Sequence, residues 1–125
     1  TRLEANYLKT VLFVMGTNNK FQAKELPLEA QAAPVFAICT LDFDEDGKKD
    51  LFLGGNISKA RLKFGKYDAN YGLILKGDGK GGFSSIPQKQ AGLRLLGDVR
   101  SVLNLGGSLM VGINQQPVKA YKFSK

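Results

Sequence analysis

The chain of 125 residues contains no histidine, no tryptophan and a single cysteine, Cys39. The lack of histidine removes the commonest general base of enzymes and the commonest protein ligand of transition metals. One cysteine excludes an intrachain disulfide, and its place in an apolar run predicts a small buried hydrophobic residue rather than a nucleophile. No run of about eighteen apolar residues occurs, so no segment is expected to span a membrane.

The chain also lacks sustained helical periodicity, whereas short apolar runs bounded by Gly, Pro or Asn recur along its length. The 15 glycines exceed average usage, which is typical of a chain with many turns. These observations predict an all-β protein in which residues 28–33 are a connector. The expected strands are residues 10–15, 21–27, 35–41, 51–54, 71–76, 83–87, 98–105, 109–114 and 118–123.

The most informative segment is residues 42–50, which carries aspartates at its first, third, fifth and ninth positions and glycine at its sixth. Carboxylates this close repel one another unless a cation neutralises them. Ca²⁺ takes about six to eight oxygen ligands in irregular geometry, and Gly47 permits the sharp bend that turns alternate side chains inward. The alternative is a solvated acidic turn without a metal. The expected ligands are Asp42, Asp44, Asp46, the carbonyl oxygen of Lys48, and Asp50.

The residues around this segment distinguish it from an EF-hand loop, which opens with the same pattern. An EF-hand needs a bidentate glutamate at the twelfth loop position, where this chain has Leu53. The flanking residues 34–41 and 51–56 are short, apolar and β-favouring. We therefore expect a strand, a calcium loop and a second strand.

A degenerate internal repeat runs through the chain. Phe21 and Phe83, each after a turn, are 62 residues apart, and Pro27 and Pro87 are 60 residues apart. Residues 98–105 correspond to the strand at 35–41, and residues 109–114 correspond to 51–56, but a short glycine turn replaces the acidic loop. A period of about 60 residues with four short strands per unit is typical of propeller-type repeats.

Through the motif at residues 41–53, the following Gly55 and Asn56, and the glycine-rich turn before Phe83, the chain resembles FG-GAP/VCBS-type β-propeller repeats. Such calcium-loop blades also occur in integrin α-subunit heads and in bacterial surface or secreted proteins. The motif covers about 40 residues, and the repeat extends over most of the chain. The resemblance implies Ca²⁺ at the acidic loop and antiparallel four-stranded blades.

The resemblance also implies how residues 1–125 divide as one propeller-repeat region. Residues 10–28 would be half a blade, residues 35–87 a full blade with the calcium loop, and residues 98–123 an incomplete blade. A propeller needs at least about four blades, so the chain is expected to be a fragment of about two. Its expected partner is the rest of a larger propeller, or other copies of itself joined through open blade edges.

The net charge of +7 favours anionic partners, such as an acidic glycan or protein surface, although scattered basic residues also serve solubility. Nucleic-acid binding is not expected, because no stacking platform or groove-reading helix is evident. The candidate recognition surface is the basic, tyrosine-bearing loop at residues 56–71; the alternative is an ordinary solvated loop whose tyrosines cap the blade core. Its expected members are Asn56, Lys59, Arg61, Lys63, Lys66, Tyr67 and Tyr71.

The sequence thus favours a calcium-stabilised, non-catalytic binding or adhesion module that recognises a protein or glycan through its blade loops. Extracellular calcium modules bind at about 0.1–1 mM, which fits an extracellular, periplasmic or cell-surface location. The alternative is part of a calcium-dependent, lyase-like propeller enzyme that degrades polysaccharides. An open calcium position facing a cleft would favour that enzyme, whereas the absence of histidine and of an evident nucleophile–base pair argues against it.

Overall fold

A computed structural model describes residues 2–59 and 65–123, and these residues form an all-β protein with antiparallel sheets. All the expected strands are present, with boundaries that differ by a few residues. The strands are β1 (Val11–Met15), β2 (Phe21–Glu25), β3 (Val35–Leu41), β4 (Asp50–Gly55), β5 (Leu73–Gly77), β6 (Phe83–Ser85), β7 (Val99–Asn104), β8 (Ser108–Ile113) and β9 (Lys119–Lys122).

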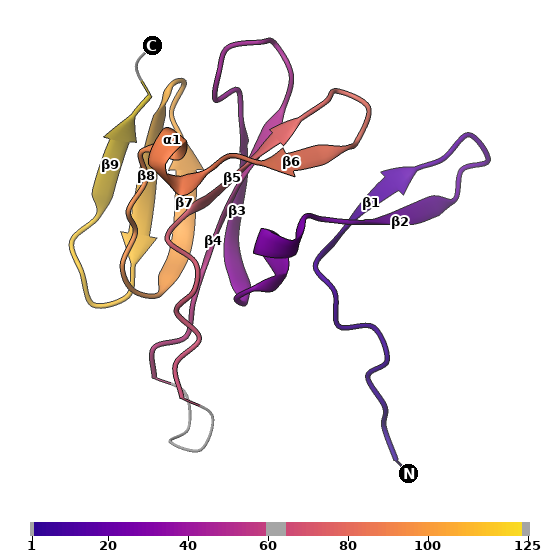
Figure 1. Cartoon of the computed structure of the whole chain (residues 1–125), viewed down its shortest axis with the longest axis horizontal. Coiled ribbons are helices and arrows are strands. Elements are labelled where there is room, and N and C mark those ends of the chain that lie inside the picture. The colour runs from indigo at the N-terminus through magenta and orange to yellow at the C-terminus, as the bar shows by residue number, and fades with distance from the viewer. Residues whose placement is uncertain (1, 60–64, 124–125) are drawn as a thin grey trace.

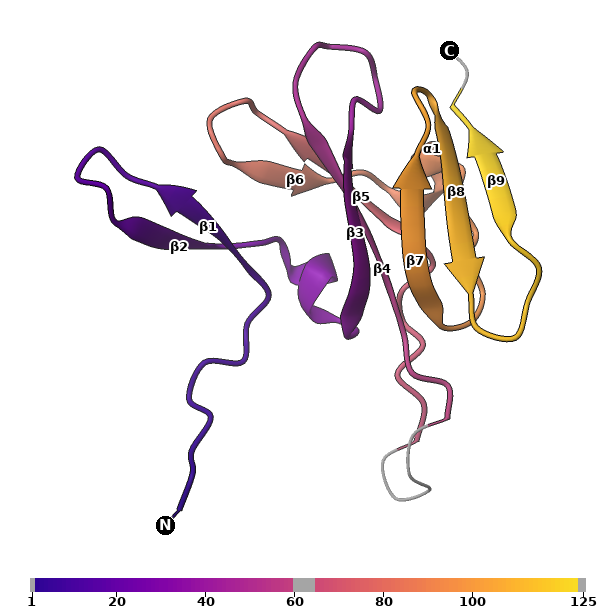
Figure 2. The same ribbon diagram turned by 180° about the vertical axis from the view of Figure 1, so that it is seen from behind.

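The strands form three sheets that stand side by side (Figures 1 and 2). We name them the N-terminal sheet (β1-β2), the middle sheet (β3-β4-β5-β6) and the C-terminal sheet (β7-β8-β9). Each lies within one of the three segments that the family resemblance implies, and strands that follow each other in sequence are neighbours in the sheet. Across the residues that the structure describes, the three sheets do not close into a ring.

The core lies between the sheets rather than within a single layer. Phe52 and Ile74 of the middle sheet belong to a buried cluster with Val111 of the C-terminal sheet. Leu53 and Leu75 belong to a second buried cluster, against which the N-terminal sheet packs. Because successive side chains of a strand point to opposite faces, β4 and β5 are buried on both sides.

The half-buried Cys39 of β3 packs against the first of these clusters, and burial raises the pKa of its thiol. This placement agrees with the prediction of a small hydrophobic residue.

Two short helices were not predicted. A 3₁₀ helix, η1 (Leu28–Gln31), occupies the expected connector, and α1 (Gln88–Ala91) follows β6. Ala30 and Ala91 are buried, so each helix covers part of the core. A few residues of helix are too short to show periodicity in a sequence. No helix in the described ranges is long and apolar enough to cross a membrane.

Two consecutive glycines end β4 because neighbouring atoms leave no room for side chains. A Cβ atom added to Gly55 would lie 1.7 Å from the carbonyl oxygen of Pro34. A Cβ atom added to Gly54 would lie 2.6 Å from a methyl carbon of Val99, on the first strand of the C-terminal sheet. The glycine pair therefore permits both the end of the β3–β4 ladder and the close approach of the next sheet.

Candidate metal centre

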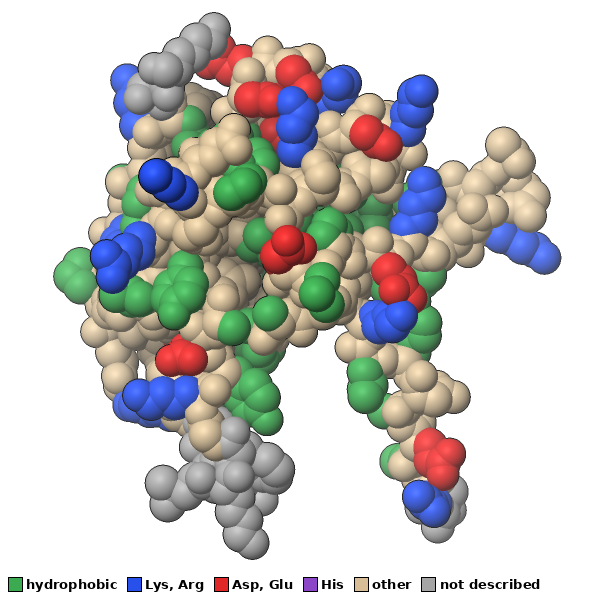
Figure 3. Space-filling view, in the orientation of Figure 1, with side chains coloured by type: hydrophobic (Ala, Val, Ile, Leu, Met, Phe, Trp, Pro, Cys, Tyr) green, Lys and Arg blue, Asp and Glu red, His purple; other side chains and the backbone are tan. Residues whose placement is uncertain are grey.

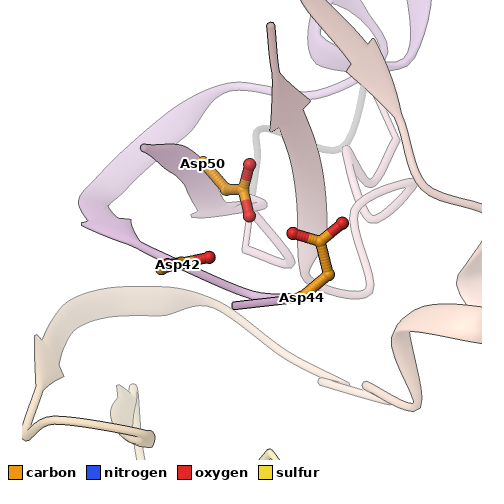
Figure 4. Close-up of side chains that lie close together, drawn as sticks. All are labelled: Asp42, Asp44 and Asp50. Carbon is orange, nitrogen blue, oxygen red and sulfur yellow. The ribbon is translucent and has the colours of Figure 1, made fainter. Parts of the chain in front are cut away.

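The turn between β3 and β4 brings three of the predicted ligands together. One carboxylate oxygen each from Asp42, Asp44 and Asp50 lies within 4.8 Å of the others. Asp42 directly follows β3, Asp50 begins β4, and the three carboxyl groups point into the same space (Figure 4). We name these three residues the acidic triad; they could hold a metal ion.

Asp50 is the buried member of the acidic triad, with 0% of its surface exposed. Its Oδ2 atom accepts a hydrogen bond from the backbone N–H of Phe43 at 2.8 Å, and its Oδ1 atom accepts one from the N–H of Gly77 at 2.8 Å. These bonds tie the acidic loop to the end of β5 and offset the cost of burying a charge. Each oxygen retains a further lone pair that a metal could use.

Asp42 and Asp44 are exposed, and their positions depend on how the loop bends. Asp42 Oδ2 accepts a hydrogen bond from the backbone N–H of Gly47 at 3.0 Å. The backbone φ angles are +79° at Gly47 and +57° at Glu45, so the loop passes twice through the left-handed region. Glycine adopts this conformation without a steric penalty, which confirms the bend expected at Gly47.

Asp46, the fourth predicted carboxylate ligand, lies outside the acidic triad. Its Oδ1 atom accepts a hydrogen bond from the backbone N–H of Lys48 at 2.9 Å, and its Oδ2 atom lies 3.2 Å from the Nζ atoms of both Lys48 and Lys76. The Lys48 N–H, together with the two ammonium groups, lowers the pKa of Asp46. Ligation by Asp46 and by the Lys48 carbonyl stays a prediction.

Lys76 of β5 brings positive charge to the acidic loop from a neighbouring strand. Its ammonium group forms ion pairs with Asp44 and Asp46, and these two carboxylates, Asp44 first, raise the pKa of the lysine. Acidic and basic side chains lie beside each other at this end of the molecule (Figure 3). A metal bound at the acidic triad would therefore compete with Lys76 for Asp44.

The donor set of the triad restricts the kind of metal that would fit. Three carboxylates with no nitrogen or sulfur donor among them suit hard cations such as Ca²⁺ and Mg²⁺. Zinc sites in proteins are built mainly from cysteine and histidine, and this chain has no histidine. The residues present thus fit the divalent cation that the sequence predicted.

A cleft of about 500 Å³ lies beside the triad, between the acidic loop and the C-terminal sheet. Asp42 and Asp44 contribute to its lining from the acidic loop, and Tyr121 and Lys122 contribute from β9. A cleft beside the metal position is the feature named above as favouring the lyase-like enzyme, so this observation supports that alternative. A non-catalytic module could use the same cleft to bind a ligand.

The described residues of the predicted recognition surface lie at the opposite end of the middle sheet from the acidic loop (Figure 1). Tyr67 and Tyr71 are 44% and 43% exposed, and Lys66 is also exposed. The ammonium group of the exposed Lys59 donates a hydrogen bond to the side-chain oxygen of Gln115 at 3.0 Å. Arg61 and Lys63 lie outside the described residues.

Asn56 does not belong to this surface, so that part of the prediction is wrong. It is 1% exposed, and its amide donates hydrogen bonds to the carbonyls of Asn70 at 2.6 Å and Gly97 at 3.2 Å. Its side-chain oxygen accepts from the N–H of Asn70 at 2.9 Å. The amide of Asn56 thus holds the two ends of the 56–70 loop together and binds them to the segment before β7.

Sequence reasoning also missed a polar cluster that fixes this loop to the C-terminal sheet. Asp98 is 5% exposed, accepts a hydrogen bond from the N–H of Ser58 at 2.7 Å and pairs with Arg100 at 3.2 Å. The guanidinium of Arg100 donates to the carbonyl of Asn56 and lies 4.4 Å from the centre of the Phe36 ring. In the sequence, this cluster is indicated only by an aspartate and an arginine two residues apart at the start of a strand.

Comparisons with protein-family models, with curated proteins and with solved structures gave no match to this chain.

Proposed function

We propose that this protein is a calcium-stabilised extracellular binding module built from β-propeller blades. The observation that carries the proposal is the acidic triad, whose carboxylate oxygens lie within 4.8 Å of one another at one end of a four-stranded antiparallel sheet. Asp42, Asp44 and Asp50 would hold the ion, with Asp46 and the Lys48 carbonyl as the further expected ligands. The bound cation supplies positive charge that offsets the repulsion among the carboxylates.

Calcium suits this loop better than magnesium for a physical reason. Magnesium requires near-ideal octahedral geometry, whereas calcium accepts irregular sets of oxygen ligands. The triad combines one buried and two exposed aspartates on a loop with two left-handed residues, which is an irregular arrangement. An affinity of about 0.1–1 mM, as in extracellular modules, would keep such a site loaded outside cells.

The arrangement of the sheets supports the blade interpretation. The middle sheet has four strands in sequential order, and its two inner strands are buried on both faces by the sheets on either side. Blades of a propeller are four-stranded sheets that repeat radially, each covering its neighbours. The N-terminal sheet would then be the last two strands of one blade and the C-terminal sheet the first three of another.

Recognition would occur at loops rather than at the metal, which anchors a hairpin. The exposed Lys59, Lys66, Tyr67 and Tyr71 form the candidate surface, together with Arg61 and Lys63 from the sequence prediction. Tyrosine presents an apolar ring with a polar tip, and lysine attracts anions, so an acidic glycan or an anionic protein surface is the expected ligand. The proposal assigns no catalytic step to this protein.

The metal part of the proposal is tested by thermal unfolding in excess calcium, in excess magnesium and in excess EDTA. We expect calcium to raise the melting temperature and EDTA to lower it, because a ligand that binds only the folded state stabilises it. Asp44→Ala should remove the calcium response, and Asp68→Ala, which changes an exposed aspartate outside the triad, should retain it. A melting temperature that is the same in calcium and EDTA would contradict the metal site.

The recognition part is tested separately by retention on immobilised acidic polysaccharide at several salt concentrations. Tyr67→Ala and Lys66→Ala should each weaken retention, whereas Lys20→Ala, at an exposed position in the β1–β2 turn, should not. Equal retention of all three variants would show that general positive charge, not this surface, causes binding.

A further inference from the structure

Within residues 2–59 and 65–123, two apolar sheet faces at opposite ends of the stack are uncovered. On the N-terminal sheet, Phe13, Met15 and Phe21 are 62%, 55% and 65% exposed; we name them the N-terminal face. On the C-terminal sheet, Leu103 is 55% exposed, Met110 is 38% exposed and Ala120 is exposed; we name these the C-terminal face. Both faces point away from the middle sheet, because their strand neighbours Leu12 and Val111 pack toward it.

Strand register shows what the C-terminal face corresponds to within the chain. The first strands of the middle and C-terminal sheets both have a bulge near their start, which aligns the two sheets. One cross-strand row of the middle sheet consists of Cys39, Phe52 and Ile74. The row in the same register of the C-terminal sheet consists of Leu103, Met110 and Ala120. In the middle sheet this row is buried under the next sheet, with Phe52 and Ile74 both 0% exposed.

The N-terminal face has an equally clear counterpart. Met15 pairs with Phe21 across the N-terminal sheet as Gly77 pairs with Phe83 across the middle sheet. Phe13 therefore corresponds to Leu75, which is 0% exposed because it packs toward the N-terminal sheet. The 62%-exposed Phe13 thus occupies a position that is fully buried one sheet later.

Both junctions inside the chain join the same two kinds of face. The row of Phe52 and Ile74 packs against the side of the C-terminal sheet that carries Val111. By register, Val111 corresponds to Leu53, which lies on the same side of the middle sheet as Leu75. Within the chain, a face that corresponds to the C-terminal face therefore packs against a face that corresponds to the N-terminal face. The two uncovered faces are one of each type.

We propose that the N-terminal face of one copy of this chain packs on the C-terminal face of a second copy, which repeats the internal sheet junction between molecules. The contact is head-to-tail, because it joins two different surfaces and neither is complementary to itself. Such a heterologous contact leaves one free face at each end, so it builds rings or open chains rather than a closed dimer. The contact requires no metal, so its test does not depend on whether the acidic triad binds calcium.

Light scattering after size-exclusion chromatography over a range of loading concentrations, in excess EDTA, tests this association. We expect a mass that rises with concentration above the 13.6 kDa of one chain. Phe13→Lys and Leu103→Lys should each give a monomer, because each places a charge in one half of the contact. Leu28→Lys is the matched control, because Leu28 is 83% exposed on η1, outside both faces.

Mixing the two monomeric variants makes the test specific for head-to-tail packing. Phe13→Lys keeps an intact C-terminal face and Leu103→Lys keeps an intact N-terminal face, so an equimolar mixture should form a heterodimer and nothing larger. Circular dichroism checks that each variant remains folded, as expected for exposed positions. The proposal would be overturned if the wild-type chain stayed monomeric at all concentrations or if the mixture did not dimerise. It would also be overturned if Leu28→Lys made the chain monomeric.

Discussion

Replacing Asp50 by alanine should destabilise this protein even when no metal is bound. The Asp50 carboxylate is 0% exposed and accepts hydrogen bonds from the backbone N–H groups of Phe43 and Gly77, both at 2.8 Å. The two donors belong to the acidic loop and to the end of β5, so the loss of this side chain removes a link between these two segments. Asp50 thus has a structural role distinct from any ligand role.

The expected magnitude follows from the two hydrogen bonds. A hydrogen bond to a charged group contributes about 1.5–3 kcal/mol, and a buried donor without a partner costs about 1–3 kcal/mol. Two such bonds lead us to expect that Asp50→Ala lowers the free energy of unfolding by about 3–6 kcal/mol, which is a large part of a typical total of about 5–15 kcal/mol. Asp50→Asn, which retains one acceptor oxygen, should cost about 1.5–3 kcal/mol.

Urea denaturation followed by circular dichroism in excess EDTA measures this effect without a metal contribution. Asp42→Ala is the matched control, because Asp42 is exposed and accepts one hydrogen bond within a turn; it should cost less than about 1 kcal/mol. In calcium, both variants should additionally lose the stabilisation due to the ion. A decrease of less than about 1 kcal/mol in the free energy of unfolding of Asp50→Ala in EDTA would refute the structural role of Asp50.

Three further predictions concern charge and packing. Lys76→Met should raise calcium affinity several-fold in calorimetric titration, because it removes an ammonium group that pairs with Asp44 and Asp46; Lys24→Met should leave the affinity unchanged. Asp78 has a pKa below its ordinary 3.8, first because it accepts a hydrogen bond from the backbone N–H of Lys80, so its contribution to stability is present above about pH 4 and is lost as the pH falls through the lowered pKa. Acid titration of Asp78→Asn should therefore show a smaller loss of stability below pH 4 than the wild type, and an identical loss would contradict this account. Phe52→Ala should lower the free energy of unfolding by about 3–5 kcal/mol in urea, because Phe52 is 0% exposed between two sheets, and a change below about 1 kcal/mol would argue against that packing.

The features that could be predicted from the sequence are those that depend on neighbouring residues. Apolar runs between Gly, Pro and Asn determine the strands, because backbone conformation and side-chain alternation are local properties. The approach of Asp42, Asp44 and Asp50 follows in the same way from a short loop between two paired strands. Aspartates so near in sequence have few ways to lie apart once β3 and β4 form a hairpin.

The features that were missed depend on residues far apart in the chain. Lys76 reaches Asp44 across 32 residues, and Asn56 bonds to Gly97 across 41 residues. Composition gives no sign of either pairing, because the position of a distant strand decides which lysine faces the acidic loop and which asparagine becomes buried. The assignment of Asn56 to an exposed surface failed for this reason.

The ammonium group of Lys76 serves as a counter-ion for the acidic loop, and it is part of the chain itself. A newly synthesised chain can therefore complete its central hairpin in a compartment that is poor in divalent ions. If the acidic triad binds a metal as proposed, the ion would replace one positive charge near Asp44 with another. Lys76, released from Asp44 by that exchange, would then add a free ammonium group to the surface beside the acidic loop.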